Sequence, residues 1–161
     1  MEPCQGAAYS SRIAASKTPS FMFVAEGQVE PVRHLVGSAL LWGSNPEADA
    51  LYLPFTPGRN DGATVHELMV KDVPVDGFWS IIVCNAEGYL VPNQYNAYSV
   101  NTIKAKKATD GSVAIQFGGC DSETPNCLPI MKSWNYMVRL FRPRSEILDG
   151  AWKFPEAQPV S

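Results

Sequence analysis

One continuous apolar segment, residues 77–84, most constrains how this chain can fold. It reads Gly-Phe-Trp-Ser-Ile-Ile-Val-Cys, and both of the faces that it would present as a strand are apolar except at Ser80. Such a strand must be covered on both sides, so we expect residues 77–84 to form a central strand of a sheet. The sequence that follows, Asn85-Ala-Glu-Gly88, is a compact hairpin loop. Residues 89–91 are predicted to return as a strand.

Further short strands are predicted between turns, in the order 51–55, 64–70, 98–108, 112–117 and 134–141. Pro54 marks the first of these as an edge strand. Thr109-Asp-Gly111 is a hairpin signal that joins residues 98–108 to residues 112–117. The thirteen prolines and twelve glycines of the chain fit frequent turns. Together these patterns predict a mainly β fold, an antiparallel β-sandwich of jelly-roll type with one N-terminal helix.

The predicted helix occupies residues 31–43, where apolar residues recur at helical spacing between Pro31 and Gly43. Residues 1–29 have no such period, and we interpret them as an irregular N-terminal arm. Residues 30–161 are the predicted β-sandwich domain. The arm is a candidate for packing on the body or for joining copies of the chain into a homo-oligomer.

Charge and hydropathy exclude some functions. The formal net charge of −3 and the lack of a basic patch beyond Lys104-Ala-Lys-Lys107 argue against nucleic-acid binding, and we interpret that run as a solvated loop. No apolar run approaches the roughly 20 residues that span a bilayer. The N-terminus lacks the pattern of a signal peptide. We therefore expect a cytoplasmic location unless an export signal has been removed.

The four cysteines leave two interpretations open. Cys84 lies in the apolar strand and is expected to be an inert core thiol. Cys120 and Cys127 flank a polar loop of six residues and can close a small disulfide in an oxidising compartment. We favour two free thiols at these positions. The spacing is not that of a zinc site, and no histidine is near.

Candidate catalytic residues are scarce. His34 is expected to face solvent from the helix, and His66 is in a strand beside Glu67, whose side chain points to the opposite face. Ser80 would need a base beside it, and His66 is the only nearby candidate in sequence. No familiar catalytic, phosphate-binding or dinucleotide motif is present. We assign no metal site and no cofactor, and His66 and Ser80 remain the less certain catalytic candidates.

Arg139 is expected on a largely apolar strand face with Met137 and Phe141. A guanidinium in such surroundings needs a partner, because a buried unpaired charge is unfavourable. Either it pairs with an acid, or it lines a pocket and binds an anionic ligand. The candidate acids are Asp76, Glu87 and Asp149.

The segment Asn93-Gln-Tyr-Asn-Ala-Tyr-Ser-Val-Asn101 is rich in amides, hydroxyls and aromatic rings. Such a composition suits a small-molecule or sugar site. An equally physical interpretation is that its amides satisfy the loop backbone before a strand begins.

An ordered series of motifs resembles the bacterial domain of unknown function numbered 1214. The series runs through Asp72-Val-Pro-Val-Asp-Gly-Phe-Trp-Ser80, Ala86-Glu-Gly-Tyr89, Asn93-x-x-Asn-x-Tyr-Ser99, Thr109-Asp-Gly-Ser112, Asn126-Cys-Leu-Pro129, Arg139-Leu-Phe141 and Leu148-Asp-Gly-Ala-Trp-Lys-Phe-Pro155. The resemblance covers residues 32–157 and implies a jelly-roll sandwich. In longer relatives this domain follows the one numbered 1254, so the chain looks like a stand-alone form.

The same resemblance suggests chemistry, because some long relatives look like hydrolases of amides or esters. This chain departs from the family pattern at two positions, with Ala97 in place of a common arginine and Cys127 in place of a common tryptophan. These changes indicate a specialised pocket or a lost one.

The first functional hypothesis is therefore a hydrolase without an organic cofactor that acts on a small ester or amide. Residues that would bind or polarise a carbonyl or carboxylate are Asn93, Asn96, Tyr98, Asn126 and Arg139. The second hypothesis is a binding module for sugar or another polar ligand, with Trp79, Tyr95 or Tyr98 as a stacking platform. The third is a structural subunit that assembles through residues 1–29.

Overall fold

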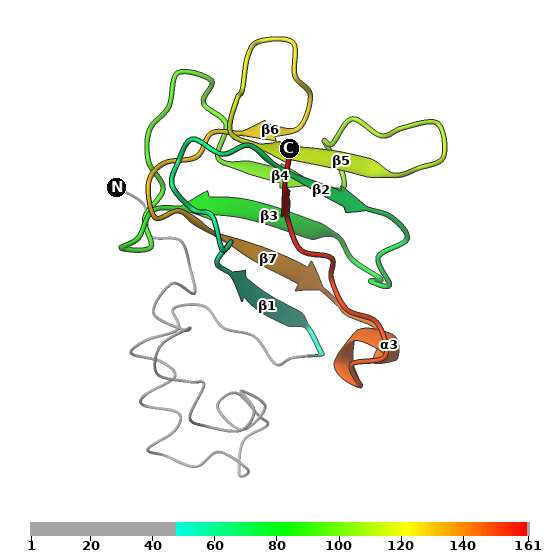
Figure 1. Ribbon diagram of the computed structural model, residues 1–161. Coiled ribbons are helices and arrows are strands. Elements are labelled where there is room, and N and C mark those ends of the chain that lie inside the picture. Colours follow the sequence, from blue (N-terminus) through cyan, green and yellow to red (C-terminus); the bar gives the residue numbers. More distant parts are fainter. Residues whose placement is uncertain (1–47, 161) are drawn as a thin grey trace, which may run out of the picture.

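The computed structural model describes residues 48–160, and in this range the chain is mainly β, with two four-stranded sheets and one short helix (Figure 1). The predicted arm, His34 and the predicted helix at residues 31–43 lie outside the described residues. The strands in chain order are β1 (Ala50–Phe55), β2 (His66–Val70), β3 (Trp79–Cys84), β4 (Ser99–Asn101), β5 (Val113–Phe117), β6 (Cys127–Leu128), β7 (Asn135–Phe141) and β8 (Gln158–Pro159).

The first sheet has the strand order β1-β7-β3-β4, and every pair in it is antiparallel. β3 lies between β7 and β4, and all six of its residues are buried. The prediction of a central strand covered on both faces is therefore confirmed. β1 is an edge strand, as Pro54 indicated.

The second sheet has the order β6-β5-β2-β8 and is mixed, because β5 and β6 run parallel while the other pairs are antiparallel. Burial alternates along β2, where His66, Leu68 and Val70 are buried and the residues between them are exposed. β5 shows nearly the same alternation. A period of two places one side-chain row of each strand in the core and the other row outside.

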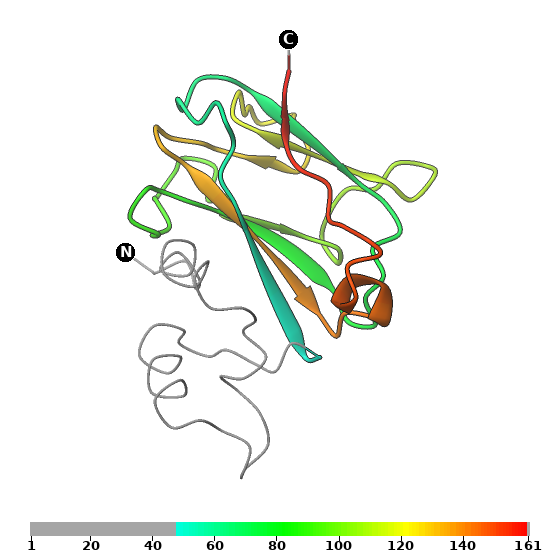
Figure 2. The same ribbon diagram turned by 60° about the horizontal axis from the view of Figure 1, so that its bottom comes forward.

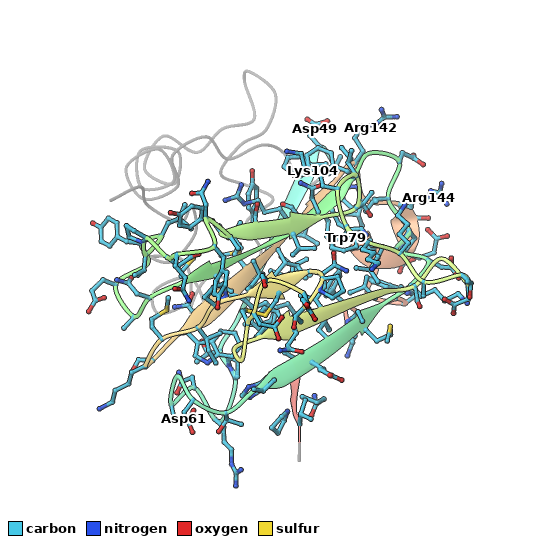
Figure 3. All side chains as sticks on the ribbon, turned by 90° about the horizontal axis from the view of Figure 1, so that it is seen from above. Asp49, Asp61, Trp79, Lys104, Arg142 and Arg144 are labelled. Atoms are coloured by element: carbon cyan, nitrogen blue, oxygen red, sulfur yellow. A yellow bond between two sulfur atoms is a disulfide. The ribbon has the colours of Figure 1, made fainter. Side chains whose placement is uncertain are left out.

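The two sheets share one hydrophobic core (Figures 1 and 2). From the first sheet it receives Ile81 and the β7 residues Tyr136, Val138 and Leu140, and from the second it receives Ile115 among others. Phe117, Trp134 and Tyr136 stack at its centre with ring centroids 5.1–5.9 Å apart. Trp79 also lies among the side chains in the middle of the molecule (Figure 3).

The predicted hairpin between residues 98–108 and 112–117 is wrong. The turn itself forms, because the Ala108 carbonyl accepts a hydrogen bond from the backbone N–H of Gly111. The strands on either side separate, however: β4 pairs with β3, whereas β5 pairs with β2 in the other sheet. β4 ends at Asn101 because the Asn101 side chain accepts hydrogen bonds from the N–H groups of Ile103 and Lys104, which starts a turn.

The predicted return strand at residues 89–91 also does not form as an extended element. Asn85 shapes the loop after β3, because its side-chain oxygen accepts hydrogen bonds from the backbone N–H groups of Glu87 and Tyr89. The strand that returns beside β3 is instead β4, which begins at Ser99. Residues 90–98 are therefore a loop, and this loop contains most of the amide-rich segment.

The C-terminal part of the chain closes one side of both layers. It begins with the short helix α3 (Ser145–Leu148), which lies beside the end of β7 and the start of β1 (Figure 1). The chain then runs past both layers to β8, which pairs with β2 (Figure 2). On the way, Trp152 packs edge-to-face against Phe154 at 5.9 Å, and Phe154 against Trp79 at 6.4 Å.

Candidate functional site

A cavity of about 620 Å³ lies between the loop that carries residues 95–105 and the loop of residues 120–127. We call it the loop cavity. Its volume lies within the range of roughly 300–1,000 Å³ that is typical of small-molecule sites. The second of its loops rises above β6 in Figure 1. The polar residues that line it are Tyr95, Asn96, Tyr98, Ser99, Asn101, Lys104, Asp121, Ser122, Thr124 and Asn126.

Asn93 shapes the first wall of the loop cavity. Its side-chain oxygen accepts hydrogen bonds of 3.1 Å from the N–H groups of Tyr95 and Ala97, and its amide nitrogen donates one of 2.9 Å to the Ala97 carbonyl. Asn96 follows with a φ of 51°, a conformation that asparagine tolerates better than most residues. The Asn93 side chain therefore fixes the backbone of this loop, whereas Asn96 and Tyr98 line the cavity.

The second wall is held by Asp121 and by a disulfide. Asp121 accepts hydrogen bonds from the N–H groups of Glu123 and Thr124 and from the Thr124 hydroxyl, at 2.7–2.9 Å. The hydrogen bonds from Thr124 are the main reason that the pKa of Asp121 is lowered, because they stabilise the charged carboxylate. Cys120 and Cys127 form a disulfide that closes the loop.

Two expectations about cysteine are therefore wrong. The favoured interpretation of Cys120 and Cys127 as free thiols fails, and the disulfide alternative is confirmed. Cys84 was expected to be an inert thiol, but it is disulfide-bonded. It is fully buried at the end of β3, so the expectation of a core position is confirmed.

A hydrogen bond joins the two walls, because the Tyr95 hydroxyl donates to the Cys120 carbonyl at 2.7 Å. Tyr95 remains 38% exposed, so part of this residue is accessible to a ligand. Tyr98 is half-buried. Lys104 is exposed and forms no ion pair within residues 48–160.

Asn126 lies at the edge of the loop cavity but has a structural role. Its side-chain oxygen accepts a hydrogen bond from the Lys106 N–H, and its amide nitrogen donates to the carbonyls of Lys106 and Ala114, at 2.8–3.0 Å. Both polar atoms of the side chain thus have backbone partners. Of the predicted site residues, Asn96, Tyr98 and Asn126 line the same cavity. The side-chain amides of Asn93 and Asn126, however, are hydrogen-bonded to backbone groups.

The structure does not bring His66 and Ser80 together. His66 is fully buried on the core side of β2, where its Nδ1 lies 2.9 Å from the Thr64 carbonyl and its ring contacts Trp134 edge-on. Ser80 belongs to the other sheet and lies between Trp79 and Ile81, which face the core, so its own side chain points away from the core. Trp79 is only 4% exposed, so the prediction that it is a surface stacking platform is wrong.

Arg139 lies outside the loop cavity. It belongs to β7, where its neighbours Val138 and Leu140 face the shared core, and it therefore faces away from the second sheet. Of its expected partners, Asp76 instead binds Arg144, with 2.8 Å between the carboxylate and Nε. No acid within residues 48–160 pairs with Arg139.

The sequence interpretation missed four polar residues of the loop cavity, namely Lys104, Asp121, Ser122 and Thr124. Lys104 had been assigned to a solvated loop, and it becomes part of the cavity because the chain turns after Asn101. The Asp-x-x-Thr spacing at residues 121–124 is a local capping pattern that could have been recognised. Its place opposite residues 95–105 depends on the fold.

The described residues contain neither a cluster of potential metal ligands nor a helix able to span a bilayer. Among the described residues, no group of three or more His, Cys, Asp or Glu side chains could hold a metal ion. None of the described helices is long and apolar enough to cross a bilayer.

Comparisons with known proteins place this chain in a family without a stated activity. The family model described as "Protein of unknown function (DUF1214)" matches residues 57–145, which is more than half of the 161 residues. No curated protein shows significant sequence similarity to this chain.

Two solved structures resemble the chain. The VPA0106 protein from Vibrio parahaemolyticus aligns with a TM-score of 0.75 and 19% identity over 92% of this chain and 41% of its own. A putative uncharacterized protein from Burkholderia cenocepacia aligns with a TM-score of 0.48 and 16% identity over 76% of this chain and 33% of its own. The chain thus spans less than half the length of either protein, and the first likeness supports the fold alone.

Proposed function

We propose that this chain, which belongs to the DUF1214 family, is a binding module for a small polar ligand that carries hydroxyl groups, such as a sugar. The proposal rests on one observation, the convergence of two tyrosines with amide and hydroxyl side chains around the loop cavity. This observation favours the binding-module hypothesis, the second of the three drawn from the sequence.

The chemistry of the walls supports this ligand class. A tyrosine offers a flat apolar ring for the C–H face of a sugar, and Tyr95 and Tyr98 both line the cavity. Asn96 supplies an amide donor and acceptor, and no hydrogen bond within the described residues occupies its side chain. Lys104 and Asp121 add one charge of each sign, so the lining favours a neutral polar ligand over a strongly charged one.

The anchoring of the walls supports binding without large rearrangement. The Tyr95–Cys120 hydrogen bond, the Asn93 bonds and the disulfide hold both loops in place before a ligand arrives. A pre-organised site loses less conformational entropy on binding.

A panel of monosaccharides, disaccharides and small amides tests the proposal. Thermal shift identifies a binder, and titration calorimetry then measures its affinity for the wild type and for Asn96→Ala and Tyr98→Ala. Each substitution should weaken binding by about tenfold, since each removes a hydrogen-bonding or ring contact. Tyr89→Ala is the matched control, because Tyr89 is 41% exposed and lies outside the cavity lining.

Two results would overturn the proposal. The first is a panel in which no compound shifts the melting temperature. The second is a binder whose affinity is the same for the wild type and for both cavity variants.

The hydrolase hypothesis stays a prediction. It would require a nucleophile or an activated water beside a base, whereas His66 and Ser80 lie on different sheets and different faces. Assay of the same chain against small esters and amides tests it, with His66→Gln and Ser80→Ala as the informative variants.

We also propose that the two layers form a β-sandwich of jelly-roll type. Support comes from the shared core, the short turns and the mostly antiparallel pairing. The resemblance of the motif series to the 1214 domain implies the same fold.

A further inference from the structure

A polar row crosses the outer face of the first sheet, the face turned away from the second sheet. The register places Tyr52 of β1 opposite Arg139 of β7, and Arg139 opposite Ser80 of β3. Directly paired residues of antiparallel strands point to the same face. The three side chains therefore lie side by side.

The surroundings of this row are apolar. On one side Ile82, Cys84 and Met137 form a second hydrophobic cluster, against which Tyr52 packs. On the other side Phe141 stacks on Phe78 with 4.3 Å between the ring centroids. Arg139 is thus a cation between two hydrophobic patches, where the low local polarity strengthens any interaction with an anion.

Arg139 has no counter-ion within residues 48–160. It forms no ion pair or hydrogen bond there, and its Nε atom is buried without an acceptor. Burial lowers the pKa of Arg139 from its ordinary value, which reflects the loss of water around the charge. The guanidinium still stays protonated, so a partly desolvated charge remains to be neutralised.

We propose that Arg139 is the anchor of a carboxylate-binding site on the outer face of the first sheet. The planar guanidinium matches a carboxylate through two parallel hydrogen bonds. The hydroxyls of Ser80 and Tyr52 are further donors in the same row. The cluster of Ile82, Cys84 and Met137 is already buried, so the half-buried pair of Phe78 and Phe141 is the side of the row that receives an apolar group attached to the carboxylate.

This site is separate from the loop cavity, and Arg139 is not in the lining of that cavity. Arg139 is half-buried, so part of its side chain remains accessible. The carboxylate can belong to a free organic acid or to an Asp or Glu side chain. Four glutamates of the chain lie outside the described residues, namely Glu2, Glu26, Glu30 and Glu47.

Titration with hexanoate, butanoate and the neutral hexanamide distinguishes these sources. If the site takes a free acid, hexanoate should raise the melting temperature of the wild type, whereas hexanamide should not. Hexanoate should bind more tightly than butanoate, by up to about fourfold for each methylene group that becomes fully buried. Arg139→Gln should weaken hexanoate binding at least about tenfold, as expected for loss of a charge-assisted pair.

Two control variants sharpen the measurement. Arg139→Lys keeps the charge but loses the planar fork, so its affinity for hexanoate should lie between those of the wild type and Arg139→Gln. Arg144→Gln removes an exposed arginine that is paired with Asp76, and it should bind hexanoate as the wild type does. Chemical-shift changes near Ser80 would locate the ligand directly on the wild-type chain.

If the site takes a carboxylate side chain, free acids should have no effect and Arg139→Gln should lower the melting temperature. The loss should then be non-additive with a Glu→Gln change at one of the four glutamates. The proposal is overturned if hexanoate does not change the melting temperature of the wild type and either of two further results is found. The first is that Arg139→Gln is as stable as the wild type. The second is that its effect on stability is additive with the Glu→Gln change at every one of these glutamates.

Discussion

At the scale of single residues, the type of a polar side chain indicated what it can bind but not which partner it has. Asn93 and Asn126 were candidates for a ligand site, and both amides bind backbone groups instead. Asn96 and Tyr98, from the same segment, remain available at the loop cavity. Asn93, Asn96 and Tyr98 lie in one short segment, so only the path of the backbone separates their roles.

Asn126 is expected to be the most sensitive of these positions. Asn126→Ala removes three hydrogen bonds to Lys106 and Ala114 and should lower the free energy of unfolding by about 1–3 kcal/mol, measured by urea denaturation. The φ of 52° adds strain for alanine. Asn126→Gly relieves that strain without restoring the hydrogen bonds. Its free energy of unfolding should therefore lie between those of Asn126→Ala and the wild type. Equal stability of all three proteins would contradict the structural role.

Asp61 should contribute to the acid stability of the fold. Hydrogen bonds from the N–H groups of Thr64 and Ala63 and from the Thr64 hydroxyl lower the pKa of Asp61 from 3.8 to about 2. The ionised carboxylate therefore stabilises the folded state above about pH 4, and this contribution is lost as the pH falls from 3.8 to about 2. Asp61 lies in the loop before β2, far from Arg142 and Arg144 in Figure 3.

Asp61→Asn should test this contribution through circular dichroism of acid unfolding. The variant keeps an oxygen acceptor but does not titrate, so its stability should decrease less steeply between pH 4 and pH 2. Parallel curves for the two proteins across that window would show that Asp61 makes no such contribution.

At the scale of elements, the alternation of side chains was a reliable guide. In β7 it predicted that Met137 and Arg139 share one face. The structure confirms this, and it turns the opposite face, with Tyr136, Val138 and Leu140, into the shared core. Partners of strands were harder to predict. The turn at Thr109-Asp-Gly111 forms, yet the strands around it enter different sheets, because Asn101 ends β4 too early for a long hairpin.

The disulfide loop before β6 should be an independent source of stability. Replacing both Cys120 and Cys127 by serine removes a link across seven positions, and the loop-entropy relation assigns about 2–3 kcal/mol to a loop of this size. The expected result is a lower urea midpoint, with an m-value equal to or slightly above that of the wild type because the unfolded chain loses a cross-link. The double variant should also bind any ligand of the loop cavity more weakly, since one wall is no longer closed.

Alkylation provides the control for this prediction. Iodoacetamide without a reductant should leave the peptides containing Cys84, Cys120 and Cys127 unlabelled, and labelling of Cys120 in the folded protein would contradict the assignment. Structural disulfides are typical of oxidising compartments, and the cytoplasmic location expected from the sequence stays a prediction.

At the scale of the whole molecule, the C-terminal segment holds the two sheets together. It passes from α3 to β8, and it is fixed to the core where the Ala157 N–H donates a 3.0 Å hydrogen bond to the Tyr136 hydroxyl. Burial raises the pKa of Tyr136 to about 12. The neutral phenol therefore stabilises the fold, and this contribution is lost as the pH rises from 10 toward 12.

Tyr136→Phe should reveal how strongly this contact holds the C-terminal segment. It leaves the buried Ala157 N–H without an acceptor, so the free energy of unfolding should fall by about 1–3 kcal/mol. Hydrogen exchange at Ala157 should also become faster. Tyr89→Phe is the matched control, because Tyr89 is exposed and should leave both measurements unchanged. Unchanged exchange at Ala157 in Tyr136→Phe would contradict the prediction.

The class of fold and the positions of the main strands could be predicted from local patterns in the sequence. The apolar segment at β3 and the alternation in β7 are local patterns, and burial of apolar surface acts on them in the same way in almost any sheet. The ordered motif series also identified the family, because short motifs in a conserved order survive where overall identity is low.

Which polar groups meet could not be predicted in this way, because it depends on the packing of distant segments. The approach of the 95–105 loop to the disulfide loop, the separation of His66 from Ser80, and the position of Arg139 between hydrophobic patches depend on contacts between residues far apart in the chain. Such contacts follow from the pairing of strands and the packing of sheets. A pattern that spans a few residues contains no information about them, because the same local period is compatible with many strand orders.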